Sequence, residues 1–431
     1  MNQPLNIPEL TPVHRDLLRV LRAAVAGNLP DTPPADWVAV QELARLHQVD
    51  HFLYPIVRAW DPAFQPVEEL MLKWRNSFLS AVALYTRASI QTAEFLTALH
   101  TEQVRVVPLK GVWLAENIYE DGTCRPMCDI DLLVHPEDLD RARSVFEQLG
   151  YTTKDYFSSV ERDKHIRYNR PDAALPIELH WRLWHPGKKG TLGEPDPSLI
   201  WEGVQEEKLH GVQVLVFPPD RQLIYLAKHI QGHNLTVPLR AYLDLILLSR
   251  CYQLNLSRLN EEARAWQVPF GAKFILQVAF DILGGAPASL TSFMPDDGTH
   301  EEERREAVCA ALQLTDESQQ LTPAMAACHQ ASWLHRLELG LSRVFVSPDM
   351  IRSNYSQVVH RFGLVGGYIS RCADLIRRRS RTWRNVARND PALHADLANF
   401  ASRKALSTWI HAQDSKNTSP YLPNSSELKN G

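Results

Sequence analysis

The sequence predicts an α+β protein in which a compact domain with a mixed β-sheet lies between two helical regions. Apolar residues recur at helical spacing before residue 102 and again after residue 220. Between those regions, short apolar runs alternate with turn residues and single helical segments over roughly 110 residues. We divide the chain into an N-terminal helical region, an α/β core, a C-terminal helical region and a disordered tail that has little to bury: residues 1–102, 103–219, 220–413 and 414–431.

The composition is that of a soluble globular protein. The chain has 431 residues, of which 45% are hydrophobic and 22% charged. A formal net charge of -4 argues against a nucleic-acid partner. The N-terminus lacks a basic segment followed by an apolar one, and no apolar run reaches the ~20 residues that span a bilayer. The six cysteines are sparse and resemble reduced thiols, so we expect a cytoplasmic protein.

Helical signals fill the first region. An apolar stripe begins at Leu17 and is broken by the prolines of residues 30–34. Asp36 is the expected N-cap of a second helix. A third, long helix is predicted for residues 67–101, with Trp74 on its buried face.

The central region changes to the period of β-strands. A proline in the first turn and a glycine after the last predict a helix at residues 136–149, and a shorter helix is expected at residues 111–119. Apolar runs bounded by turn residues predict strands at residues 104–109, 130–134, 151–157, 165–169, 176–182 and 212–217.

The third region returns to helical spacing. The acidic stretch of residues 295–306 is expected to be a solvated loop that leads into another helix. The predicted apolar helices are residues 223–233, 239–251, 270–283, 334–346 and 358–379.

Asp129 and Asp131 mark the candidate active site. In a strand, alternate side chains share a face, so the two carboxylates point together while Ile130 and Leu132 point into the core. Neighbouring carboxylates repel each other unless a cation lies between them. Hard oxygen ligands of this kind suit Mg²⁺ or Mn²⁺. The pair therefore predicts a metal-dependent site for phosphoryl transfer.

Glu178 is the candidate third carboxylate. It has apolar neighbours on both sides, as expected for one polar residue that faces a cleft from a strand. If its strand lies beside residues 130–134, three carboxylates converge and could hold two metal ions roughly 4 Å apart. Glu178 could also help to deprotonate the nucleophile, because neighbouring carboxylates are expected to raise its pKa.

Lys110, Gly111 and Arg125 are the candidate phosphate-binding residues. Gly111 allows close approach to the backbone at a turn from strand to helix, and the N–H groups of a helix start favour a phosphate. Lys110 could place its charge on a triphosphate, and Arg125 could grip the same anion with two hydrogen bonds. In the alternative, the Lys-Gly pair is only a turn and Arg125 pairs with Asp129 or Asp131.

Several segments together carry a resemblance to a known family. They lie within residues 36–290 and comprise the helices from Asp36 to Tyr54, Leu109–Gly111, Arg125–Val134, Gly150-Tyr151, Ile177–Trp181, Tyr225–His233 and Leu239–Leu248. These segments resemble the uncharacterised nucleotidyltransferase family of the DNA polymerase β-like superfamily. The resemblance implies a nucleotidyltransferase-like mixed sheet, Mg²⁺ and a nucleoside triphosphate, with Asp129, Asp131 and Glu178 as the catalytic carboxylates. The wider superfamily has Gly-Ser at the phosphate turn, where this chain has Lys110-Gly111.

Other polar residues are candidates for the acceptor site. His180 follows the third carboxylate, and His229, His233, Arg240 and Asp244 lie in the helical region after the core. They could line the cleft in which an acceptor or a base binds. A buried polar network that joins two helices is the alternative.

Two further features have mainly structural interpretations. Residues 371–388 include seven arginines and Trp383, which favours a solvated helix face over a surface for nucleic acid or another anion. Cys124 and Cys128 have no second Cys or His pair nearby at zinc-finger spacing, so packing is favoured over a zinc site.

We therefore expect an enzyme that moves a nucleoside monophosphate from a triphosphate to a hydroxyl-type acceptor on a small molecule, peptide or protein. An Asp-x-Asp pair after an apolar strand also occurs in glycosyltransferases that use nucleotide sugars. A nucleotide-binding scaffold without activity is the third hypothesis.

Overall fold

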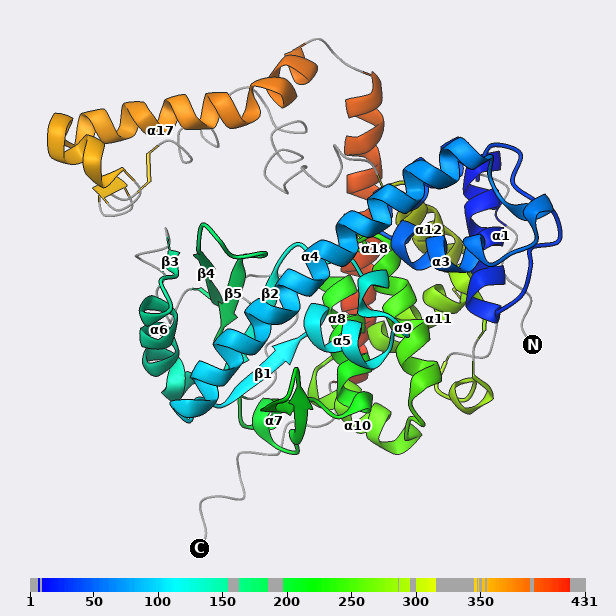
Figure 1. Cartoon of the computed structure of the whole chain (residues 1–431), viewed down its shortest axis with the longest axis horizontal. Coiled ribbons are helices and arrows are strands. Elements are labelled where there is room, and N and C mark those ends of the chain that lie inside the picture. The colour runs from blue at the N-terminus through cyan, green and yellow to red at the C-terminus, as the bar shows by residue number, and fades with distance from the viewer. Residues whose placement is uncertain are drawn as a thin grey trace, which may run out of the picture.

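The computed structural model describes residue 7 and residues 10–153, 163–184, 197–285, 287–294, 300–314, 345–346, 348, 351–352, 355–387 and 391–418. A mixed sheet and a bundle of helices lie side by side, and the long helix α4 runs across both (Figure 1). No helix among the described residues is long and apolar enough to cross a membrane.

The N-terminal region is helical, as predicted. It contains α1, α2, α3 and α4 and one 3₁₀ turn, at Pro12–Ala26, Trp37–Leu46, Asp50–Arg58, Glu68–Thr101 and Pro62–Phe64. Asp36 caps α2, because its Oδ1 accepts a hydrogen bond from the N–H of Ala39 at 3.0 Å. Trp74 of α4 is fully buried, and its indole N–H donates to the carbonyl of Asp50 at 3.0 Å. This contact fixes the first half of α4 against α3.

The central sheet has five strands in the order β1-β2-β5-β4-β3. The β2–β5 pair is parallel, and the other three pairs are antiparallel. The strands in chain order are Val106–Leu109, Ile130–Val134, Thr152–Thr153, His165–Asn169 and Ile177–His180. The predictions for β2 and β4 have the correct bounds. The strand predicted at residues 151–157 is described only at Thr152–Thr153, since residues 154–162 lie outside the described part.

The two faces of this sheet have opposite character. Ile130 and Leu132 pair with Ile177 and Leu179, and all four are fully buried. On this apolar face, Phe146 of α6 lies between Tyr168 of β4 and Phe95 of α4. The prediction that Ile130 and Leu132 point into the core is therefore confirmed. The opposite face carries the polar residues of the candidate site.

The core also holds elements that connect the strands. They are α5, α6, α7, β6 and β7 and two 3₁₀ turns, at Gly111–Asn117, Leu139–Gln148, Pro197–Trp201, Gln205–Leu209, Val212–Val216, Gly122–Cys124 and Pro136–Asp138. The helix predicted at residues 136–149 thus starts as a 3₁₀ turn. Two elements were not predicted, α7 and β6, and β6 pairs antiparallel with β7.

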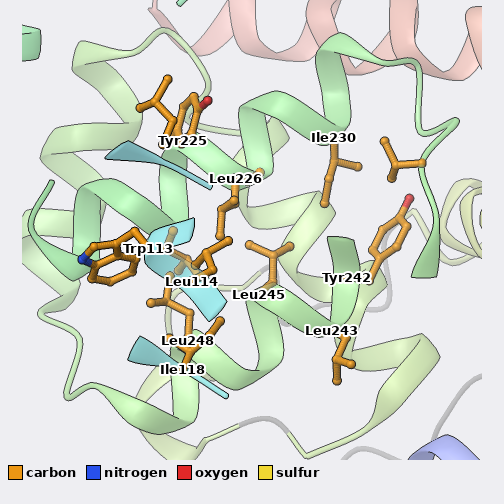
Figure 2. Close-up of a cluster of buried hydrophobic side chains, with 14 of the residues drawn as sticks. Trp113, Leu114, Ile118, Tyr225, Leu226, Ile230, Tyr242, Leu243, Leu245 and Leu248 are labelled. Atoms are coloured by element: carbon orange, nitrogen blue, oxygen red, sulfur yellow. The ribbon is translucent and has the colours of Figure 1, made fainter. Parts of the chain in front are cut away.

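The C-terminal region is a helical bundle. Its helices α8, α9, α10, α11, α12, α17 and α18 and one 3₁₀ turn span Pro219–Gly232, Leu239–Cys251, Leu256–Ala265, Gly271–Leu283, Glu301–Leu312, Ser356–Ala387, Pro391–Thr418 and Ala288–Leu290. Figure 2 shows how the bundle joins the core: Trp113, Leu114 and Ile118 of the α5 segment pack with Leu226 of α8 and Leu248 of α9.

Two predictions for this region need correction, and one helix was missed. Residues 301–306 belong to α12 and not to a loop; the glutamates at its start favour a helix N-terminus electrostatically. Helix α10 was not predicted. The tail does not begin at Asp414, because α18 continues to Thr418 and Asp414 is buried against α11.

Two other predictions are only partly covered. Helix α17 includes residues 358–379 and carries the first arginines of the basic segment, but a non-helical residue, Gly363, interrupts it. The helix predicted at residues 334–346 lies outside the described residues except for its last two.

Candidate functional site

The candidate site lies on the polar face of the sheet, where β2 and β5 start. Asp131 and Glu178 are register partners on these parallel strands, so their side chains leave the sheet side by side. Asp129 precedes β2 by one residue and is partly exposed. The charges of Asp131 and Glu178 both act on Asp129. The structure therefore brings together the three carboxylates that the sequence predicts.

Lys110 contacts the most buried of these carboxylates. Its Nζ lies 3.1 Å from Asp131 Oδ2, and β1 brings it there because Leu109 pairs with Asp131. Lys110 has a φ of 41°, an unfavourable conformation for a residue with a side chain. Burial alone would lower the pKa of Lys110, but Asp131 and the hydroxyl of Tyr225 raise it above the ordinary value. A protonated lysine thus lies at the acidic pair.

Gly111 leaves room for another group to approach the backbone closely, and in this structure side chains occupy that room. A Cβ atom at Gly111 would lie 3.0 Å from Met127 Sδ and 3.5 Å from a guanidinium nitrogen of Arg125. Because no side chain projects from Gly111, the segment before Asp129 can pack directly on the start of α5.

Glu178 belongs to a row of polar residues across β4 and β5. His165 pairs with His180, and Arg167 pairs with Glu178, in the antiparallel register of the two strands. Glu178 Oε2 lies 3.6 Å from His180 Nε2 and 3.8 Å from His165 Nε2, whereas Oε1 lies 3.5 Å from an Arg167 nitrogen. His180 Nε2 also lies 2.9 Å from Asp131 Oδ1, so this imidazole bridges the carboxylates of both strands.

The pKa shifts of the carboxylates differ. Burial and the neighbouring charges of Asp131 and Glu178 raise the pKa of Asp129. Burial would raise the pKa of Asp131 too, but Lys110 and His180 hold it well below its usual range. The hydrogen bond from His180 lowers the pKa of Glu178. The charge of Asp131 raises the pKa of Glu178, as expected, but the hydrogen bond from His180 outweighs it, so the expected net rise is wrong for Glu178; Asp129 is the carboxylate whose pKa is raised.

One group in the described part of the chain has the geometry of three metal ligands: His165, Glu178 and His180, whose ligand atoms all lie within 4.8 Å of one another. The set predicted from the sequence, Asp129, Asp131 and Glu178, does not form such a group in this arrangement. The reason is electrostatic, since Asp131 turns to Lys110 and His180 while Glu178 turns to the imidazoles and Arg167. Neither Cys124 nor Cys128 belongs to the ligand group.

Helix α8 contributes the other side of the site. Lys110 and Asp131 both act on the hydroxyl of Tyr225. His229 and His233 follow Tyr225 by one and two helical turns. Burial and the charge of Lys110 lower the pKa of His229 well below its ordinary value, and they lower the pKa of His233 to about 4. The two rings lie 4.4 Å apart, and His233 directly follows the last residue of α8. His229 and His233 are thus neutral at neutral pH and lie near Lys110.

Arg125, Arg240 and Asp244 form a separate, buried network. The Arg125 guanidinium donates two hydrogen bonds to Asp244, at 2.9 and 2.7 Å, and is itself only 4% exposed. Asp244 also accepts a hydrogen bond from the hydroxyl of Tyr119 at 2.7 Å. Arg240 donates to Gln48 at 2.9 Å. The structure thus gives Arg125 a carboxylate partner in place of the predicted phosphate, and joins Arg240 and Asp244 to a polar network.

The sequence analysis missed His165, Arg167 and Tyr225. A signal for the first two was present, because the strand of residues 165–169 alternates polar and apolar side chains and was predicted with the correct bounds. Its pairing partner was not known, so nothing placed His165 beside His180. Tyr225 could not be distinguished from the apolar residues around it in α8.

The fold and this site define an α+β protein with acidic, lysine and histidine side chains grouped on one face of a mixed sheet. A family model described as an uncharacterised nucleotidyltransferase matches residues 33–284, and the chain belongs to that family. No match is found among the curated proteins. The family resemblance predicted from the sequence is therefore confirmed. Membership supports nucleotidyl transfer as the general activity and favours it over glycosyl transfer.

Proposed function

We propose that this protein transfers a nucleoside monophosphate from a nucleoside triphosphate to a hydroxyl group of a small molecule, peptide or protein, with the help of Mg²⁺ or Mn²⁺. The observation that carries the proposal is the side-by-side placement of Asp131 and Glu178, with Asp129 beside them and Lys110 in contact. Hard carboxylate oxygens are the ligands that Mg²⁺ and Mn²⁺ prefer, so the residue types fit the ions once Asp131 turns from Lys110 and His180, and Glu178 from Arg167.

Asp129, Asp131 and Glu178 would hold the ions, which supply neutralising charge for the triphosphate and a lower pKa for the attacking hydroxyl. In the reaction, the acceptor oxygen forms a bond to the α-phosphorus while the bond from that phosphorus to the pyrophosphate oxygen breaks. The hydroxyl proton passes to a carboxylate of the site, and pyrophosphate leaves. We assign the proton to Asp129, because Lys110 and His180 hold Asp131 while the imidazoles and Arg167 hold Glu178.

Lys110 is the proposed phosphate ligand. Its ammonium group already lies against Asp131 and would have to turn only from the carboxylate to an anionic oxygen of the substrate. His229 and His233 are proposed to face the acceptor, because they lie near Lys110 at the C-terminal end of α8 and stay uncharged. An uncharged pair can exchange hydrogen bonds with a hydroxyl group without competing for the triphosphate.

Transfer of label tests the proposal. The protein is mixed with Mg²⁺, a cell extract as the source of acceptors, and ATP, GTP, CTP or UTP labelled in the α-phosphate. We expect label to enter an acceptor with the wild type and with Asp140→Asn, whose carboxylate is exposed in the first turn of α6, but not with Asp129→Asn. Absence of transfer from all four nucleotides, or equal transfer by Asp129→Asn, would contradict the proposal.

A further inference from the structure

The group formed by His165, Glu178 and His180 contains two imidazoles, which a site for Mg²⁺ alone does not need. The strands place all three on the same face, since His165 pairs with His180 across β4 and β5 and Glu178 lies two residues before His180. Glu178 is half-buried and His180 is almost fully buried.

The ligand atoms of this group lie slightly farther apart than they would around a bound ion. Zn²⁺ lies about 2.0 to 2.2 Å from nitrogen and oxygen ligands, so two ligands at the tetrahedral angle are roughly 3.4 Å apart. Glu178 Oε2 lies 3.6 Å from His180 Nε2 and 3.8 Å from His165 Nε2. Small side-chain rotations would close these gaps.

Neighbouring residues orient the carboxylate and complete the surroundings. Arg167 contacts Glu178 Oε1 at 3.5 Å, which leaves Oε2 turned toward the two imidazoles. Asp131 Oδ1 lies 2.9 Å from His180 Nε2 and is a further oxygen beside the group. Arg167 is thus the contact outside the three ligands that orients Glu178, whereas Asp131, which lies at the same His180 nitrogen that would bind the ion, would be a fourth ligand.

The ligand types select the ion. Imidazole nitrogen is a good ligand for Zn²⁺ and related transition metals, whereas Mg²⁺ prefers oxygen ligands and water. We propose that His165, Glu178 and His180 bind one divalent transition-metal ion, with Zn²⁺ as its representative, in preference to Mg²⁺. This inference rests on the proposed function for the use of the ion, but its binding can be measured without any nucleotide.

The test is calorimetric titration of the full-length protein with ZnCl₂ or MgCl₂, in a reducing buffer and without nucleotide. His165→Gln removes one ligand from a partly exposed position. His100→Gln is the matched control, because His100 is exposed near the end of α4. We expect the wild type and His100→Gln to bind one more equivalent of Zn²⁺ than His165→Gln does, or to bind it at least ~10-fold more tightly.

A second measurement tests whether a variant loses Zn²⁺ binding for a reason other than misfolding. Zn²⁺ bound to the folded state raises the melting temperature, and this rise should be present in the wild type and lost in both His165→Gln and Glu178→Gln. Equal Zn²⁺ affinity of His165→Gln and wild type, or a wild-type affinity for Mg²⁺ that matches that for Zn²⁺, would overturn the inference.

The two proposals fail in different ways. Zn²⁺ binding that depends on His165, in a protein that transfers no label, would support this inference and contradict the proposed function. Label transfer in Mg²⁺, with Zn²⁺ binding that is indifferent to His165→Gln, would support the proposed function and contradict this inference.

Discussion

Arg125 and Asp244 lie 119 residues apart in the chain and form a bidentate ion pair in the interior, with nitrogen–oxygen distances of 2.9 and 2.7 Å. Arg125 belongs to the segment that leads to Asp129, and Asp244 lies in the middle of α9. Both side chains are almost fully buried. This pair therefore ties the segment before the candidate catalytic carboxylates to the helical bundle.

Removal of one partner should leave the other as an uncompensated buried charge. Asp244→Ala is expected to lower the free energy of unfolding by about 3–5 kcal/mol, measured by urea denaturation. The double variant Arg125→Met/Asp244→Leu should recover only part of the loss, because it removes the unpaired Arg125 but still leaves Arg240, 3.8 Å from Asp244, and the Tyr119 hydroxyl without that carboxylate. Lys73→Ala is the control: its ion pair with Glu69 is exposed, and its loss should leave the midpoint unchanged. An Asp244→Ala protein as stable as Lys73→Ala would contradict this account.

The sequence predicted local features well and long-range partners poorly. The bounds of β2, β4 and α9 were correct because apolar periodicity and clear turn residues mark them. Strand β6 was missed because four of its five residues are not buried, so no apolar alternation marks it. Arg125 was predicted to grip a phosphate, with an ion pair to Asp129 or Asp131 as the alternative. Only the packing of α9 on the core shows that its partner is Asp244.

For the candidate site, the sequence likewise predicted the residues but not their contacts. The three carboxylates were predictable, because each lies in or beside a strand with apolar neighbours. The contacts of each carboxylate were not predictable, because those contacts depend on strand register. The pairing of β4 with β5 sets His165 and Arg167 around Glu178, and the pairing of β1 with β2 sets Lys110 against Asp131.

Asp129 should limit stability and yet be essential for activity. Its pKa is raised by burial and by the charges of Asp131 and Glu178, so its ionised form destabilises the folded state at neutral pH. Asp129→Asn should therefore melt no lower than the wild type, while label transfer falls at least ~100-fold. Thermal melting and the transfer assay, run on the same preparation, check both parts. A marked fall in melting temperature would show that the charge is needed for folding.

Lys110 should influence metal and triphosphate in opposite directions. Its ammonium group holds the Asp131 carboxylate in the form without metal, so Lys110→Met should tighten the binding of Mn²⁺ alone. The same variant loses a positive charge for the phosphates and should bind a non-hydrolysable triphosphate about 10-fold more weakly. Calorimetry measures both affinities, with Lys73→Met as the control. If the triphosphate affinity is unchanged, Lys110 is not a phosphate ligand.

Asp281 should make stability depend on pH. Burial raises the pKa of this carboxyl to about 6, although Arg304 lies 3.6 Å away and Gln277 donates a hydrogen bond at 3.2 Å. The folded state therefore keeps a proton that the unfolded chain has lost between about pH 4 and pH 6, so stability falls as pH rises through this window.

Asp281→Asn removes this titration and keeps an acceptor for Gln277. Its free energy of unfolding should match that of the wild type below about pH 4 and exceed it by on the order of 2 kcal/mol above about pH 6. Urea denaturation at several pH values gives the difference between the two proteins. A difference that does not change with pH would show that Asp281 is ionised throughout.

The end of α18 should be required for stability. Asp414 Oδ1 accepts hydrogen bonds from the backbone N–H groups of Phe270 and Gly271, at 2.9 and 2.8 Å, at the start of α11. Gln231 of α8 donates to the other carboxylate oxygen at 2.9 Å. A buried carboxylate here satisfies donors that a helix N-terminus otherwise leaves unpaired.

Two truncations test whether Asp414 stabilises the bundle or belongs to a tail that contributes nothing to stability. A chain that ends at Thr418 keeps Asp414 and should unfold at the same urea concentration as the full-length protein. A chain that ends at Gln413 leaves three buried donors without an acceptor and should lose about 1–3 kcal/mol or more. Asp414→Ala in the full-length protein should reproduce the loss. If both truncations unfold like the full-length protein, the contact between α18 and α11 does not stabilise the bundle.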